Sequence, residues 1–134
     1  MLKKVLLTLA VATFGLLVPV LEISETHLFN PLWPPHARLH EGWQLVTNSA
    51  IAGVCLWLAW RKGDVRGAAL LALVVVAGFL AAFGLSATYG GSMLHTDGSE
   101  IAIGGVNVAV LVMVLAGVIL AILAASRDRR QTDL

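Results

Sequence analysis

Four histidines give the chain its clearest capacity for chemistry. His36 and His40 are four positions apart, so a helix would present both imidazoles on one face, where they could bind one metal ion. His27 and His95 lie in two other polar segments and could complete the ligand set. Because imidazole suits zinc, iron and copper, we predict a divalent transition metal held by these four side chains. The alternative is that His36 and His40 are simply two surface histidines at the start of a helix.

Acidic residues near the histidines could take part in the same chemistry. Glu25, Glu41 and Glu100 each lie close in sequence to a histidine. A carboxylate beside a bound metal can act as a further ligand or as a general base. We therefore predict catalytic roles for these three residues, with hydrolysis and oxidation both left open.

A polar stripe follows the histidine pair along the same predicted helix. At 100° per residue, five polar side chains fall within an arc of about 120°: His36, His40, Gln44, Thr47 and Asn48. Polar groups at membrane depth are costly and usually face a cavity or a partner, so the stripe predicts a pocket. Its predicted lining residues are Arg38, Gln44, Thr47, Asn48 and Asn107.

Three of these lining residues also have simpler interpretations. Asn48 and Asn107 could serve only to form hydrogen bonds between helices. Arg38 could pair with a nearby acid, or its guanidinium could bind a phosphate or carboxylate headgroup. The pocket is the sharper hypothesis, and these alternatives stay beside it.

The segment that carries three of the histidines resembles a known pattern. It reads Asn30-Pro31, then Trp33-Pro34-Pro35-His36-Ala37-Arg38, then His40, with His27 upstream. This N-P-x-W-P-P-H-A-R-x-H run is similar to an outer-loop segment of a small family of uncharacterised four-helix membrane proteins. The resemblance covers about one eighth of the chain and implies no activity. It favours the view that this loop is the functional centre.

The elements that must position these residues are long apolar segments. The chain is 58% hydrophobic and only 13% charged, and its mean hydropathy is +0.86. Soluble domains carry about 25% charged residues, so we predict an all-α, polytopic membrane protein with a single domain over residues 1–134. Its four-helix transmembrane bundle is expected at about residues 3–24, 36–60, 67–86 and 101–125. The lone Cys55 excludes a thiol–disulfide oxidoreductase, which needs a cysteine pair.

The distribution of charge predicts the orientation of these four segments. Eight of the nine basic residues fall at one end of a four-span arrangement, and only Arg38 lies at the other. The positive-inside rule makes the basic end cytoplasmic, so both termini are expected inside, in a plasma or inner membrane. The outer end then holds all four histidines and carries a net charge of −4. A cleaved signal peptide is the alternative for the first segment, but no small-x-small cleavage site follows it.

These expectations combine into one leading function and three alternatives. The leading hypothesis is an outward-facing pocket of histidines and carboxylates, with a metal-dependent site that acts on a lipophilic substrate. The alternatives are a non-enzymatic membrane subunit, an oligomeric transporter component, and a pH-responsive element built on the histidines. The expected partners are the lipid bilayer, a lipophilic substrate and further copies of the chain, with no nucleic acid.

Overall fold

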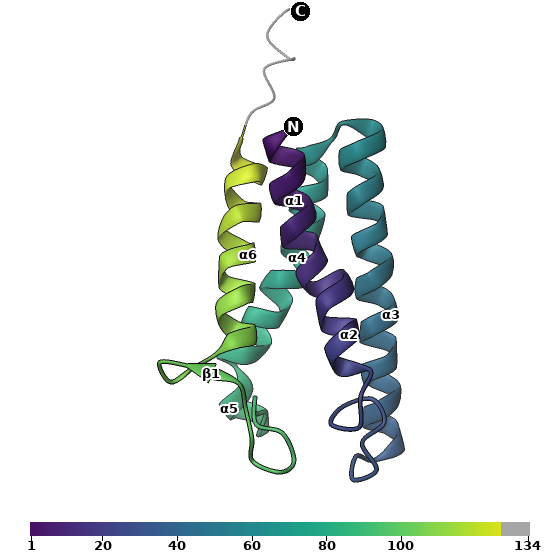
Figure 1. Ribbon diagram of the computed structural model, residues 1–134, viewed down its shortest axis with the longest axis vertical. Coiled ribbons are helices and arrows are strands. Elements are labelled where there is room, and N and C mark those ends of the chain that lie inside the picture. The colour runs from purple at the N-terminus through teal and green to yellow at the C-terminus, as the bar shows by residue number, and fades with distance from the viewer. Residues whose placement is uncertain (127–134) are drawn as a thin grey trace, which may run out of the picture.

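The protein consists of four long helical segments that lie side by side, as a computed structural model shows for residues 1–126 (Figure 1). The first segment is α1 (Leu2–Ala12), η1 (Thr13–Leu17) and α2 (Val18–Glu22); the second is α3 (Pro35–Trp57) and η2 (Leu58–Lys62); the third is α4 (Val65–Gly84); the fourth is α6 (Val108–Ala125). Between α4 and α6 lie the short helix α5 (Ser86–Tyr89) and a hairpin of β1 (Ala102–Ile103) and β2 (Val106–Asn107). The segment predicted to begin at 101 therefore becomes helical only at Val108.

Three of the four segments are long and apolar enough to cross a membrane. They are Leu2–Glu22, Val65–Gly84 and Val108–Ala125, of which the last has the highest hydropathy, 3.1. The segment from Pro35 to Lys62 is longer but less apolar, because it carries the polar stripe. The prediction of a largely helical, membrane-compatible chain is therefore confirmed. The arginines at 127, 129 and 130, which entered the charge argument, lie outside the described residues.

Small side chains let the helices approach closely. The buried alanines come from all four segments: Ala10, Ala52, Ala59, Ala68, Ala69, Ala72, Ala116 and Ala124. Larger apolar side chains fill the space between them, chiefly Leu7, Phe14 and Leu120. Small residues at helix interfaces are the usual means of packing in membranes, where water does not drive association. The helices α1, α3, α4 and α6 therefore pack closely against one another through these buried side chains.

The first segment contains a π-helical turn whose cause is Pro19. Proline has no N–H, so it cannot donate to the carbonyl of Gly15 four residues earlier. The backbone widens over Thr13–Leu17, where the N–H of Val18 reaches the carbonyl of Thr13. The Oγ of Ser49 on α3 donates to the freed Gly15 carbonyl at 3.3 Å. A side chain of a neighbouring helix thus replaces the missing backbone bond.

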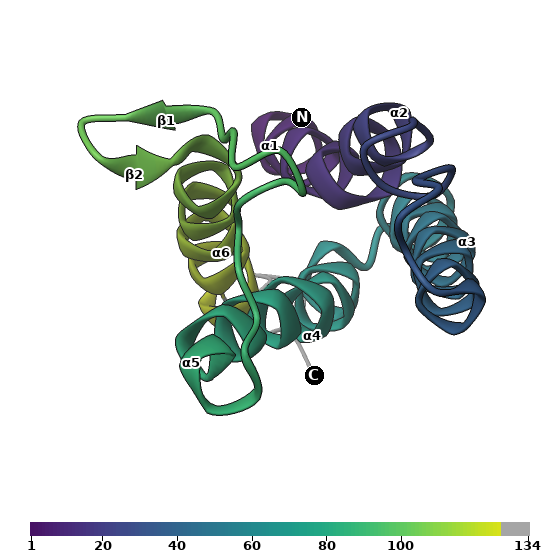
Figure 2. The ribbon, with the colours of Figure 1, turned by 90° about the horizontal axis from the view of Figure 1, so that it is seen from below.

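One end of the molecule joins the helix ends that carry most of the basic residues. The Nε of Arg66 donates to the carbonyl of Ala124 at 3.1 Å, and the Nζ of Lys3 donates to Ser126 Oγ at 3.1 Å. Lys4 lies over the ring of Trp60, 5.5 Å from its centroid. The opposite end, which we call the loop end, holds the first loop (residues 23–34) and the second loop (residues 90–101) (Figure 1). Seen from that end, the four segments surround a common centre (Figure 2).

Candidate functional site

The predicted histidine pair lies on the first turns of α3. The helix begins at Pro35, which suits the first helical position because its missing N–H is not needed there. The Nε2 atoms of His36 and His40 are 3.0 Å apart and the ring centroids 4.5 Å apart. Both side chains are exposed. We call these two residues the helix pair.

The other two histidines form a second pair, which connects the two loops. The imidazoles of His27 in the first loop and His95 in the second meet edge to face, with centroids 5.0 Å apart. The ring of Trp33 also meets His27 at its edge, at 5.9 Å. His27 and His95 are 68 positions apart in sequence, so this contact joins the first loop to the second. We call these two residues the loop pair.

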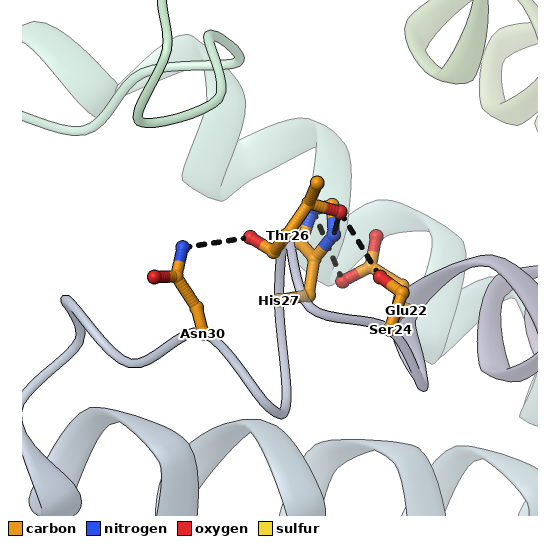
Figure 3. A network of polar contacts seen from close by, with 5 residues as sticks. All are labelled: Glu22, Ser24, Thr26, His27 and Asn30. Atoms are coloured by element: carbon orange, nitrogen blue, oxygen red, sulfur yellow. Dashed lines mark hydrogen bonds and ion pairs between the residues drawn. The ribbon is translucent and has the colours of Figure 1, made fainter.

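His27 is held in place by a chain of polar contacts (Figure 3). Its Nδ1 lies 2.9 Å from the hydroxyl of Thr26, which in turn lies 3.0 Å from the hydroxyl of Ser24. Its Nε2 lies 3.7 Å from a carboxylate oxygen of Glu22, at the end of α2. Both ring nitrogens therefore have polar partners, and the ring is fixed toward the second loop.

The surroundings of His27 favour its neutral form. Burial and the neighbouring His95 lower the pKa of His27 below its ordinary value of 6.5, and the carboxylate of Glu41 opposes this shift. The shift is downward, so burial and the second imidazole outweigh the acid. Its closest ionic partner by distance is Glu22 rather than Glu41.

Glu22 and Glu41 bring two carboxyl groups together beside the loop pair. Burial and the neighbouring Glu22 raise the pKa of Glu41 to about 7, so the Glu41 carboxyl is mostly protonated below that pH. The Oε1 atom of Glu41 is buried and has no hydrogen-bond partner among residues 1–126. Glu41 was among the predicted catalytic residues, but its partner Glu22 was not. We call Glu22, His27, Glu41 and His95 together the loop joint.

Asn30 is a second residue that the sequence reasoning did not assign to the site. It is only 2% exposed and is the one fully buried polar side chain of the described residues. Its amide donates to the carbonyl of Thr26 at 3.1 Å and to Thr96 Oγ1 of the second loop at 3.4 Å, while its oxygen accepts the N–H of Leu32 at 2.9 Å. Asparagine followed by proline is a recognisable turn signal, which could have marked this residue.

The predicted pocket residues divide between two open hollows. One, of about 330 Å³, lies along α3 and is lined by His40, Trp43, Gln44, Thr47 and Asn48. The other, of about 430 Å³, lies beside the hairpin and includes Glu100 and Asn107 in its wall. Asn107 also donates to Glu100 at 3.0 Å and caps α6 by accepting the N–H of Ala109. All residues of the predicted stripe except His36 thus line one hollow, while Asn107 lines the other.

Arg38 and Glu25 line neither hollow. Glu25 is exposed and Arg38 is half-buried. Within residues 1–126 no ion pair is formed by either side chain.

A metal centre with three or more protein ligands is not assembled in the described part of the chain. No group of three histidine, cysteine, aspartate or glutamate side chains there has an arrangement that could hold a metal ion. The four histidines form two pairs rather than one cluster, because His27 and His95 turn toward each other. A zinc, iron or copper cofactor stays a prediction of the sequence, and the helix pair is the set of imidazoles that could chelate it.

The comparisons with known proteins are sparse. A model of a family of unknown function (DUF6640) matches residues 6–133. No curated protein and no solved structure matches the chain.

Proposed function

Since the chain belongs to this family of unknown function, its role has to be inferred from its own geometry, and we propose that it is a four-span membrane protein whose outer loops respond to pH. The observation that carries the proposal is the edge-to-face contact of His27 and His95, which joins the two loops at 5.0 Å. Both termini would face the cytoplasm and the loop joint would face outward. This is a non-enzymatic role, and the geometry supports it better than a metal-dependent one.

The helix dimensions support a fourth span. The 23 residues of α3 and the five of η2 form one continuous segment, which is about 42 Å long at 1.5 Å per residue. A hydrocarbon core of about 30 Å leaves the first turns of α3 outside the membrane. His36 and His40 would then be hydrated. Trp57 and Trp60, next to Arg61 and Lys62, would lie at the inner interface, where tryptophan is enriched.

Protonation of the loop pair would separate the loops. Neutral imidazoles can pack edge to face, but two imidazolium ions repel each other. At the observed 5.0 Å separation this repulsion is about 3 kcal/mol for an effective dielectric constant of about 20. The groups that face His27 are Glu22 of α2, Glu41 of α3 and His95 of the second loop. Burial and the neighbouring Glu22 raise the pKa of Glu41 to about 7, so its carboxyl is mostly protonated at the pH at which His27 takes up its proton. Glu41 therefore offsets little of the repulsion between the two imidazolium ions.

The direction of the pH dependence follows from the His27 shift. Its pKa in the folded protein lies below the ordinary 6.5, so the unfolded chain takes up the proton first as the pH falls. The stability that the closed joint contributes is therefore fully present above about pH 6.5 and is lost as the pH falls through the folded pKa. Acid opens the joint, and neutral pH closes it.

The test is the pH dependence of thermal unfolding in lipid nanodiscs. Because the raised pKa of Glu41 stabilises the fold as the pH falls, the contribution of the loop pair is measured as the difference in stability between the wild type and the double variant His27→Gln/His95→Gln. We expect this difference to be smaller at about pH 5 than at about pH 7.5, by on the order of 1–3 kcal/mol. The matched control is His36→Gln/His40→Gln, which removes an exposed pair of similar ring separation within one helix and should follow the pH dependence of the wild type. Equal pH dependence in all three proteins would contradict the proposal.

A further inference from the structure

The hairpin between the second loop and α6 is a tight, regular element. Its strands pair antiparallel, with Ala102 opposite Asn107 and Ile103 opposite Val106. The two turn residues, Gly104 and Gly105, have φ values of 60° and 80°, as a two-residue turn of type I′ requires. The register therefore continues the pairing to Ile101 and Val108, and the N–H of Val108 donates to the Ile101 carbonyl at 2.9 Å.

This register makes the hairpin amphipathic. Side chains alternate between the faces of a strand, and cross-strand partners share a face. One face therefore carries only branched apolar residues: Ile101, Ile103, Val106 and Val108. The other carries Ala102 and Asn107, with the Asn107 amide donating to Glu100. Two side chains of the apolar face are largely exposed, since Ile101 is 73% exposed and Ile103 67% exposed.

The position of the hairpin places this face at the level of a membrane surface. The hairpin projects sideways from the loop end of α6, away from the other helices (Figures 1 and 2). The 18 residues of α6 span about 27 Å, slightly less than the hydrocarbon core of about 30 Å. When α6 is centred in the bilayer, the residues just before Val108 therefore reach the boundary between acyl chains and headgroups.

We propose that the hairpin docks onto the outer surface of the lipid bilayer through Ile101 and Ile103. The inference rests on the proposed membrane placement of α6 and adds a contact that this placement does not require. Lipid is the occupant because the face is continuous with α6, the most apolar helix of the described residues. A two-stranded hairpin has unpaired backbone groups on both edges, so it cannot sink into the hydrocarbon. At the headgroup boundary its edges are hydrated while its apolar face contacts acyl chains.

Spin labels at neighbouring positions of one strand test this docking. On a Cys55→Ala background, a nitroxide is attached at Ile103→Cys or at Ala102→Cys, which point to opposite faces. A third label at Val114→Cys, an exposed position within α6, reports whether the helix is in lipid. Each variant is reconstituted in phosphatidylcholine vesicles, and its accessibility to oxygen and to a water-soluble nickel complex is measured. We expect a severalfold higher oxygen-to-nickel ratio at 103 than at 102, with the highest ratio at 114.

The possible outcomes separate this inference from the proposed function. If position 103 is as accessible to nickel as position 102 while 114 remains in lipid, the docking is wrong and the membrane placement stands. Low accessibility of 103 to both reagents means that protein covers the face, which overturns lipid as its occupant. If 114 itself is exposed to nickel, the membrane placement of α6 fails together with the docking.

Discussion

At the scale of single residues, the environment of a histidine rather than its presence determines what it can do. His36 and His40 contact each other but remain exposed within one helix. His27 contacts His95 from another loop, and burial lowers its pKa. The exposed pair lies within one helix, whereas protonation of the half-buried His27 ring changes the free energy of a contact between distant segments.

Asn30 should contribute more to stability than any other amide of the described residues. Asn30→Ala removes the bridge to Thr96 and leaves the N–H of Leu32 without its acceptor, at a cost of about 1–3 kcal/mol. Asn48→Leu is the control, because Asn48 makes no side-chain hydrogen bond within residues 1–126 and typical interhelical bonds in membranes contribute only about 0.6 kcal/mol. Thermal unfolding in detergent compares the two. A larger loss in Asn48→Leu would show that the loops do not depend on Asn30.

The contact between Glu22 and Glu41 makes a separate prediction as the pH rises through about 7, the value to which burial and the neighbouring Glu22 raise the pKa of Glu41. When both carboxyls ionise, they repel each other across a short distance and should destabilise the loop end. Glu41→Gln removes one of the two charges, so it should be more stable than the wild type by about 1–3 kcal/mol at high pH. Glu25→Gln, which removes an exposed acid outside the joint, should follow the wild type. An alkaline unfolding profile of Glu41→Gln that matches the wild type would disprove the contact.

At the scale of elements, the contact between η1 and α3 depends on a glycine. A Cβ at Gly15 would overlap the side chain of Ala52, so Gly15→Ala should force the helices apart and cost about 1–3 kcal/mol. Gly53→Ala on α3 is the control, because nothing lies within 4 Å of its added Cβ. It should be neutral or stabilising by up to about 1 kcal/mol. Thermal unfolding of both variants measures the difference, and equal stability would place the helices farther apart than described.

The sequence predicts the helical elements better than the connections between them. Apolar length locates the helices because membrane thickness fixes how many residues each one needs. The hairpin was instead assigned to the fourth helix, since its residues are apolar, although Gly104-Gly105 between branched residues was a usable hairpin signal. The His27–His95 and Glu22–Glu41 contacts join residues distant in sequence, and no local pattern encodes such pairings. The four histidines form two pairs rather than the predicted single cluster for the same reason, because the position of each loop depends on contacts between residues distant in sequence.

At the scale of the whole molecule, the proposed topology can be tested directly. On the Cys55→Ala background, cysteines at Ser24 and Ser92 should react with an impermeant thiol reagent on intact cells. A cysteine at Gly63, in the turn between η2 and α4, should react only after the membrane is opened. This pattern follows from the concentration of basic residues at the end of the molecule that holds Gly63. Labelling of Gly63 but not of Ser92 on intact cells would reverse the orientation or remove a span.

The most direct test of the central claim is the distance between the two loops as a function of pH. Spin labels at Phe29→Cys and Leu94→Cys, both at exposed positions, would report this distance by pulsed electron resonance in nanodiscs. We expect one short distance at about pH 7.5 and a second, longer one that becomes dominant at about pH 5, with its midpoint below the ordinary histidine pKa of about 6.5. The same labels in His27→Gln/His95→Gln should show no such transition. A wild-type distance distribution that is identical at both pH values would contradict the account.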